Sequence, residues 1–252
     1  MTKCSAKRIS KSVLLSLTAV LLVFSTMAWA QNDDKSDIEK RLDTSATVLT
    51  QIMGTPDKGI PNNVLDSAEC VAVVPSLVKI AIGFGGSHGK GVATCRTAHG
   101  WSAPAPITIT GGSWGLQLGG QATDLVMLVM NEKGMTDLLS SKFKVGAGAS
   151  AAAGPVGRDA AASTDWKMKA EVLSYSRSRG VFAGVDLNGS SITQDKDATR
   201  LLYGKMVPFA DLLRGKVAPP QSAESFLGTV RKFSAQAKES GSINTPTPNH
   251  GQ

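Results

Sequence analysis

Ser87 and Ser113 each stand in a G-x-S-x-G pattern, which in hydrolases presents a nucleophilic serine on a sharp turn. Such enzymes need an acidic residue and a histidine further along the chain. After Ser113 the only histidine is His250. No Asp or Glu lies between Glu69 and Asp124. Because a chain rich in Gly and Ser matches this pattern by composition alone, we predict that neither serine is a catalytic nucleophile.

The glycine-rich segment 83–91 is similar to a phosphate-binding loop but departs from both common patterns. A P-loop needs glycine where this chain has Phe84, and Ser or Thr where it has Gly91. A dinucleotide-binding pattern that begins at Gly83 needs glycine where this chain has His88. The segment therefore predicts a hairpin loop between two strands and no bound nucleotide.

Four residues have side chains that can bind zinc: Cys70, His88, Cys95 and His99. Cys95 and His99 have usable spacing, but the other two are far apart in the sequence. No pair of carboxylates suitable for acid–base catalysis stands out. We therefore predict a protein that is not an enzyme and that has no cofactor and no metal ion.

Most of the elements that would position these residues are predicted to be short strands. Gly-Gly pairs and Pro75 mark where strands end, and Asn188-Gly189 is a typical hairpin turn. The predicted strands cover residues 70–75, 78–84, 92–96, 106–110, 114–118, 125–130, 167–176, 181–187 and 190–193. We predict one α+β domain with a central antiparallel β-sheet or barrel and helices at both ends.

Helices are predicted before and after these strands. Ser36 to Glu39 form a capping box, and apolar residues recur at helical spacing, so residues 31–59 predict an N-terminal amphipathic helix. Because the polar face of this helix is mixed in sign, we expect its apolar stripe to pack on the domain. Shorter helices are predicted at 61–69, 135–140, 195–203 and 208–213.

The last helix is predicted to begin at Pro219-Pro220, within a C-terminal helical region at 205–238. One face of this helix carries four apolar residues, which are Phe226, Leu227, Val230 and Phe233. The polar segment 239–252 is rich in Pro, Asn and Ser and predicts a disordered tail.

The first 30 residues have the organisation of a secretory signal peptide. A basic start is followed by an apolar run at 13–24, which is too short to span a membrane. Small residues at Ala28 and Ala30 fit a peptidase site. We predict cleavage near Ala30, export to the periplasm or cell envelope, and no transmembrane segment in the mature chain.

Cleavage would also change the charge of the chain. It removes four of the 27 Lys and Arg, which leaves 23 against 20 Asp and Glu. This small excess argues against a nucleic-acid partner. In an oxidising compartment Cys70 and Cys95 are able to form a disulfide, and the alternative is two buried thiols.

Short motifs recur in one order across about two-thirds of the mature chain. They lie at residues 60–61, 68–75, 79–91, 100–104, 115–120, 123–126, 154–158, 173–177, 180–184 and 202–204. In this order they resemble the SYLF domain family, so a SYLF-like domain is expected at 60–204. The resemblance implies the family fold and a non-enzymatic domain.

Eukaryotic members of that family bind phosphoinositide membranes, and some act on actin assembly. This chain departs from them because it has a predicted signal peptide and no SH3 or FYVE module, so cytoplasmic actin is not expected as its partner. The resemblance therefore implies that this chain has an actin-binding-like domain and shares the tendency of the family to bind acidic lipid.

Cations within or beside the glycine-rich and strand segments are the candidates for that binding. Lys142 and Lys144 share one strand face by their spacing. A lysine near an anionic lipid surface contributes about 1 kcal/mol. The candidate lipid-binding residues are Lys79, Lys90, Lys142, Lys144, Arg158, Lys167 and Lys169, with Arg96 as a further cation nearby.

We therefore predict an exported, non-enzymatic protein that binds an anionic phospholipid or membrane surface through a basic face. The alternative is a structural component of the cell envelope that binds a protein partner through its last helix and tail.

Overall fold

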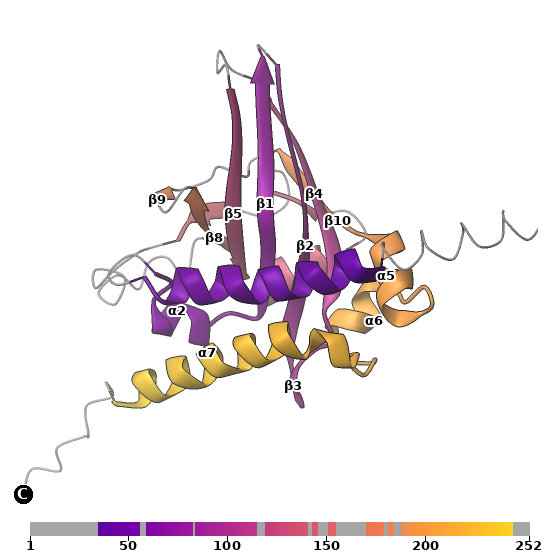
Figure 1. Cartoon of the computed structure of the whole chain (residues 1–252). Helices are drawn as coiled ribbons and strands as arrows, with labels where there is room; N and C mark the ends of the chain where they lie inside the picture. The colour runs from indigo at the N-terminus through magenta and orange to yellow at the C-terminus, as the bar shows by residue number, and fades with distance from the viewer. Residues whose placement is uncertain are drawn as a thin grey trace, which may run out of the picture.

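The computed structural model describes residues 35–55, 59–82, 84–114, 119–140, 143–145, 151–154, 170–178, 181–183, 187 and 189–243. In this part of the chain a central sheet is flanked by helices (Figure 1). The prediction of a single α+β domain is confirmed. The sheet is open rather than closed into a barrel.

The sheet contains ten strands. They are β1 (Cys70–Ile82), β2 (Phe84–Thr97), β3 (Gly100–Trp101), β4 (Ala105–Trp114), β5 (Gly119–Val129), β6 (Phe143–Lys144), β7 (Ala151–Ala153), β8 (Val172–Ser178), β9 (Val181–Ala183) and β10 (Ser190–Gln194). The order is β6-β10-β4-β2-β1-β5-β8-β7, with β3 beside β2 and β9 beside β8. The central ladders are antiparallel as predicted, whereas β7 and β8 are parallel.

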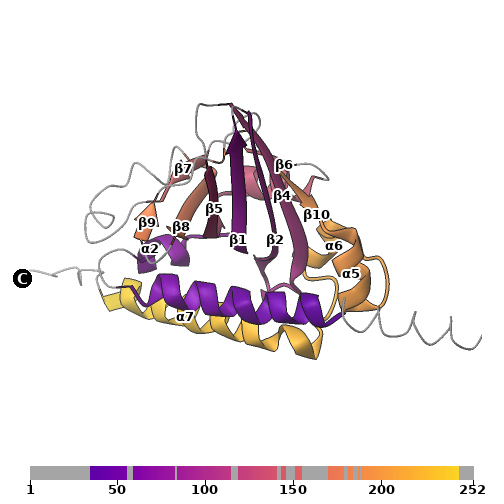
Figure 2. The ribbon, with the colours of Figure 1, turned by 45° about the horizontal axis from the view of Figure 1, so that its top comes forward.

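The described helices are the N-terminal helix at residues 35–53, α2 (Asn62–Asp66), α3 (Glu132–Leu139), α5 (Lys196–Tyr203), α6 (Phe209–Leu213) and α7 (Glu224–Ile243). A short 3₁₀ turn, η2 (Gln221–Ala223), precedes α7. The N-terminal helix and α7 lie side by side (Figure 2). Among the described helices, none combines the length and the apolar character needed to cross a membrane.

Several helix boundaries differ from the predictions; for example, α2 ends at Asp66 instead of at residue 69. Helix α3 begins at Glu132 because the Asn131 side chain accepts the Gly134 N–H and caps the first turn. Helix α7 continues to Ile243, so the disordered tail predicted from residue 239 is wrong for residues 239–243. The rest of that tail and the predicted signal peptide lie outside the described residues.

The lower half of the sheet is buried on both faces because its strand residues are apolar on both sides. Val71 and Val73 pack toward the N-terminal helix and α7, and Ala72 and Val74 pack toward α3 and α6. The N-terminal helix buries a stripe at helical spacing, as expected for packing on the domain: Ile38, Leu42, Leu49 and Ile52.

Strand β1 passes through the proline that was predicted to end it. The ladder with β2 shifts register between Val73 and Val78, and the ladder with β5 shifts between Val74 and Leu77. Each shift places one extra residue in β1. Ser76 has φ 59°, and its N–H donates to Asp124 Oδ1 at 3.1 Å. Pro75 and Ser76 therefore form a β-bulge, where a residue without a ladder hydrogen bond is tolerated.

The glycine-rich segment 83–91, predicted as a loop, belongs mostly to strand β2. Its glycines are required where the neighbouring strand β1 approaches closely beside the bulge. A Cβ on Gly91 would lie 2.2 Å from the Val73 carbonyl oxygen, and one on Gly89 would lie 2.7 Å from Val74 Cγ1. Glycine here permits close approach of two strands instead of forming a loop.

The turn at Gly189 forms, with φ 78°, but it does not join two paired strands as predicted. In the described part of the sheet, β10 pairs with β4 and β6, and β9 pairs with β8. A hairpin-type turn signal predicts the local bend of the chain, but it does not determine which strands pair.

Candidate functional site

Cys70 and Cys95 are paired in a disulfide between β1 and β2. They are directly opposite in the ladder, their Cα atoms are 3.9 Å apart, and both are fully buried. The zinc set considered from the sequence therefore loses both of its cysteines. In the part of the chain that the structure describes, no group of three or more His, Cys, Asp or Glu side chains is placed to hold a metal ion.

Ser87 and His88 are consecutive residues of strand β2, so their side chains point to opposite faces of the sheet. Ser87 is opposite Lys79, and His88 is opposite Val78. His88 therefore cannot act as a base for Ser87. Ser113 is in register with Gly85 on β2.

The candidate site that the structure assembles lies where β1, β2, β4 and β5 extend beyond the layer of helices (Figure 1). Directly opposite residues of paired strands point to the same face. One row of such residues crosses six strands as Ala122, Val78, His88, Thr110, Ser191 and Lys144.

This row belongs to the face on which the N-terminal helix packs further down the sheet. Val92 of β2 is buried against that helix layer, and Lys90 and His88 follow it on the same face at two-residue spacing. Ile80 is next to Val78 on this face, one row nearer the end of the hairpin. We call five exposed residues of this face the distal patch: Val78, Ile80, His88, Lys90 and Lys144.

The distal patch contains two unusually exposed aliphatic side chains. Val78 is 40% exposed and Ile80 is 57% exposed. Where burial is described, the third large exposed hydrophobic residue is Met206, which is 38% exposed and lies in the α5–α6 connection. Two aliphatic side chains at neighbouring positions of one face form a local apolar surface rather than scattered exposure.

The structure separates the predicted lipid-binding cations. Lys90 and Lys144 are exposed members of the distal patch. Lys79 is half-buried and lies on the opposite face, because it follows the buried Leu77 at two-residue spacing. The remaining candidates, which are Lys142, Arg158, Lys167 and Lys169, lie outside the described residues.

Arg96 has a structural role. Its guanidinium donates to the carbonyl oxygens of Ala68 and Leu65 at 2.8 and 3.1 Å. It also lies 4.7 Å from the centre of the Trp101 ring. These contacts tie β2 to the segment after α2 and hold the guanidinium in the fold.

Lys90 contacts a buried carboxylate at the base of the distal patch. Asp195 Oδ2 lies 3.7 Å from Lys90 Nζ and accepts a 3.1 Å hydrogen bond from Arg41 Nη1. Its Oδ1 accepts the N–H of Ala198 and caps α5. Asp195 therefore connects the N-terminal helix, β2 and α5. Aspartate before a helix predicts the cap, but neither cationic partner can be inferred from the sequence.

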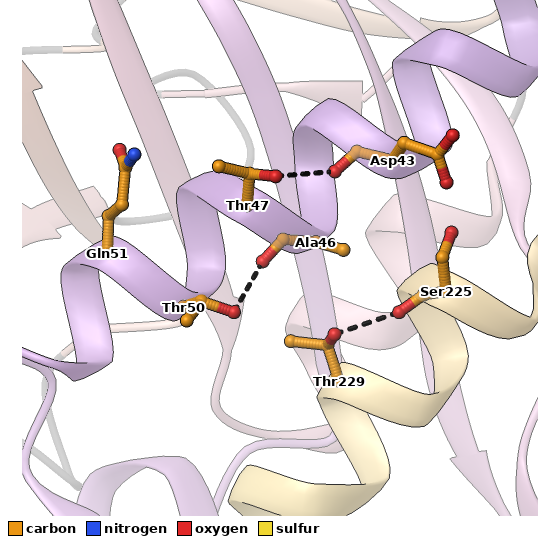
Figure 3. Close-up of a pocket in the computed structure, with 7 residues that line it drawn as sticks. All are labelled: Asp43, Ala46, Thr47, Thr50, Gln51, Ser225 and Thr229. Carbon is orange, nitrogen blue, oxygen red and sulfur yellow. Dashed lines mark hydrogen bonds between the residues drawn. The ribbon is translucent and has the colours of Figure 1, made fainter.

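A separate groove of about 420 Å³ lies between the N-terminal helix and α7 (Figure 3). It is lined by Asp43, Ala46, Thr47, Thr50, Gln51, Ser225 and Thr229. Each of the three threonine hydroxyls donates to the carbonyl oxygen four residues earlier, as the dashed lines show. These hydroxyls are thus hydrogen-bonded within their own helices, and most of the exposed surface that lines the groove is apolar.

The groups with shifted pKa values are structural. Burial raises the pKa of Tyr175 and of Tyr203 well above the usual range. Tyr203 donates its hydroxyl hydrogen to the Pro104 carbonyl oxygen at 2.6 Å. The hydrogen bond to Glu171 raises the pKa of Lys133. None of the three described residues with a raised pKa belongs to the distal patch or lines the groove.

Comparisons with known proteins give the family. Residues 110–233 match the model of the Ysc84 family, which is described as "Las17-binding protein actin regulator". LAS seventeen-binding protein 3 of Saccharomyces cerevisiae is 33% identical over 196 residues, which is 75% of this chain and 42% of that protein. Protein YSC84 of the same yeast is 34% identical over 181 residues, which is 70% of this chain and 38% of that protein.

The human SH3 domain-containing YSC84-like protein 1 is 30% identical over 188 residues, which is 74% of this chain and 55% of that protein. This chain therefore spans between 38% and 55% of the length of these relatives. The resemblance seen in the motifs is confirmed over most of the chain: it belongs to the Ysc84, or SYLF, family.

Proposed function

We propose that this chain is an exported, non-enzymatic SYLF protein that binds an anionic phospholipid surface through the distal patch. The observation that carries the proposal is that Lys90 and Lys144 share one exposed sheet face with Val78 and Ile80. Cations beside exposed aliphatic side chains are the combination that an anionic lipid surface attracts.

The charge around the patch supports this proposal. The segment 70–123 contains Lys79, Lys90 and Arg96 and no Asp or Glu. It includes β1, β2, β4 and the first residues of β5, which extend beyond the helices, and β3, which lies at the opposite end of the sheet (Figure 1). The described part of β5 carries one carboxylate on this face, that of Asp124, which is half-buried and accepts the Ser76 N–H. A second carboxylate, that of Asp195, is turned toward Arg41 and Lys90 at the base of the patch. Both acidic groups near the patch therefore have hydrogen-bond or ionic partners.

The cellular location belongs to the same proposal. The first 30 residues have the basic start, the apolar run and the small residues of a signal peptide. We place the mature protein in the periplasm or cell envelope, and the disulfide is the kind of bond that persists there. Intact-mass measurement of the purified protein checks this, because cleavage near Ala30 yields a chain that starts at Gln31.

Co-sedimentation with vesicles tests the lipid proposal. The purified protein is mixed with vesicles of phosphatidylcholine alone, or of phosphatidylcholine with phosphatidylglycerol, over a range of salt concentrations. Binding to the anionic vesicles should weaken as salt rises, because exposed charges are screened within about 10 Å at 0.1 M salt. Equal binding to neutral vesicles, or no effect of salt, would contradict the proposal.

A protein partner is the second candidate function, and the names of the family and of its yeast relatives, which refer to Las17 binding, favour it. The apolar face of α7 is not free for this role, because Phe226, Leu227 and Val230 are buried in the core. A partner would have to use the exposed side of α7, where Lys232 and Lys238 lie.

Cross-linking in intact cells separates the two candidates. Lys232→Glu with Lys238→Glu should remove a cross-link to an envelope protein if α7 is the binding surface. Lys90→Gln with Lys144→Gln should leave that cross-link intact. The opposite pattern would exclude α7 as the partner surface.

A further inference from the structure

We propose that the end of the β1–β2 hairpin inserts into the apolar layer of the membrane, with Ile80 as the main inserted side chain and Val78 beside it. This inference rests on the proposed lipid binding and identifies its apolar contact. It changes the expected mode of binding from adsorption by charge alone to insertion of a defined element.

The first argument is the contrast between the two halves of β1. In its lower half Val71, Val73 and Val74 are fully buried. Above the bulge at Ser76, Val78 and Ile80 are exposed although they belong to the same strand. Exposed aliphatic residues at the free end of a strand are unfavourable in water and become favourable when an apolar phase covers them.

The second argument concerns the backbone. An element that enters the apolar layer must have its N–H and C=O groups paired, since each unpaired group is costly there. Strand β1 lies between β2 and β5, and its pairing continues to Ala81 and Ile82. Strand β2 lies between β1 and β4 and is paired from Phe84 onward. Neither strand is an edge of the sheet in this region, so insertion exposes no open ladder of theirs.

The third argument is the order of residues along the strands. Lys90, His88 and Gly86 follow one another on β2 at two-residue spacing, and Gly86 is opposite Ile80. Two residues of a strand span about 7 Å, so the Ile80 row lies about 14 Å beyond Lys90. Lys90 can therefore remain at the headgroups while Ile80 reaches the acyl chains, because the polar layer on each side of a bilayer is about 5–8 Å thick.

On the face of Ile80 the directly opposite residues carry no charge, while the charged Lys79 lies on the other face of β1. Gly86 and Gly120 are directly opposite Ile80 on the two adjacent strands. The chain turns at Ile82 and Phe84, which are apolar residue types. Charge complementarity assigns the surface to an anionic lipid, because two exposed cations, Lys90 and Lys144, lie on the same face as Val78 and Ile80.

Depth-dependent fluorescence quenching tests the insertion. Ile80→Trp and Met206→Trp are compared with the wild-type chain on phosphatidylcholine–phosphatidylglycerol vesicles whose acyl chains carry bromine. Both replaced residues are exposed, so the two variants are matched. Ile80→Trp should show quenching beyond that of the wild-type tryptophans, and Met206→Trp should show none.

A second pair of variants measures the contribution of the side chain. Ile80→Asn should weaken binding to the same vesicles by about tenfold, because it removes an aliphatic side chain from the apolar layer. Met206→Asn should leave the affinity unchanged. Circular dichroism and thermal unfolding check that each variant is folded. We expect both to fold, because Ile80 and Met206 are exposed.

The two proposals fail in different ways. If the wild-type chain binds anionic vesicles but Ile80→Trp is not quenched and Ile80→Asn binds normally, insertion is wrong and charge-driven binding stands. If neutral vesicles bind as well and quench Ile80→Trp, insertion is supported and the anionic preference is wrong. If the wild-type chain binds neither vesicle, both proposals are wrong.

Discussion

Asp195 should be one of the most important polar residues for stability, because three elements meet at its carboxylate. Its side chain is 9% exposed, and that of its partner Arg41 is 14% exposed. Replacing Asp195 with alanine removes the cap of α5 and leaves Arg41 without its ion pair. Asp195→Asn keeps an oxygen for the cap and removes only the charge.

The size of the effect follows from these two contributions. Loss of an N-cap costs about 1 kcal/mol. Removing one partner of a fully buried ion pair costs about 3–5 kcal/mol. Because Arg41 and Asp195 retain some exposure, we expect the loss of their ion pair to cost about 2 kcal/mol of stability, which is below the range for a fully buried pair. The free energy of unfolding should therefore fall by about 3 kcal/mol in Asp195→Ala and by about 2 kcal/mol in Asp195→Asn.

Urea unfolding of the purified variants measures these differences. Asp197→Ala is the matched control, because Asp197 is in the first turn of the same helix, pairs with Arg200 and is 89% exposed. Its substitution should change the free energy of unfolding by less than about 0.5 kcal/mol. Equal losses in Asp195→Ala and Asp197→Ala, or no loss in Asp195→Asn, would refute this reasoning.

Three other perturbations have expected outcomes. Reducing the Cys70–Cys95 disulfide, which links residues 25 apart, should lower the free energy of unfolding by about 3.5 kcal/mol in urea titrations with and without reductant. Gly91→Ala should destabilise the protein strongly, whereas Gly112→Ala, whose Cβ meets nothing within 4 Å, should not. Thermal unfolding measures both variants, and equal stability of the two would contradict the close approach of β1 and β2 at Gly91. Burial raises the pKa of Tyr203 above its unfolded value of 10.0, so the contribution of the neutral hydroxyl to the free energy of unfolding is complete below pH 10. This contribution is lost as the pH rises from 10 toward the higher pKa of the folded state. The free energy of unfolding should therefore fall more steeply with pH above pH 10, and Tyr203→Phe should make that fall smaller.

The fold class and most helices followed from the sequence because their signals are local. Apolar spacing identified the N-terminal helix and α7, and Asp195 marked the start of α5. The strands were harder to delimit. Proline and glycine usually interrupt strands, but here Pro75 lies in a bulge of β1, and the glycines of β2 allow β1 to approach closely. Those roles depend on the neighbouring strand, which local patterns do not contain.

The candidate site was only partly predictable for the same reason. Lys90 and Lys144 were chosen from the sequence, but their common face depends on a register that runs through β2, β4, β10 and β6. Lys79 was also a candidate lipid-binding residue and lies on the other face, because the bulge adds a residue to β1. Val78 and Ile80 were predicted only as strand residues. Their exposure results from the length of the strands relative to the helix layer (Figure 1).

The most direct test of the account compares two double variants that lower the net charge equally. Lys90→Gln with Lys144→Gln changes the distal patch, and Lys232→Gln with Lys238→Gln changes exposed lysines of α7. The affinity of each for phosphatidylcholine–phosphatidylglycerol vesicles is measured by co-sedimentation at one salt concentration. Two lysines at the lipid surface contribute about 2 kcal/mol, so the patch variant should bind about 30-fold more weakly than wild type, and the α7 variant should bind nearly as well as wild type. Equal weakening in both variants would show that net charge, and not the distal patch, determines binding.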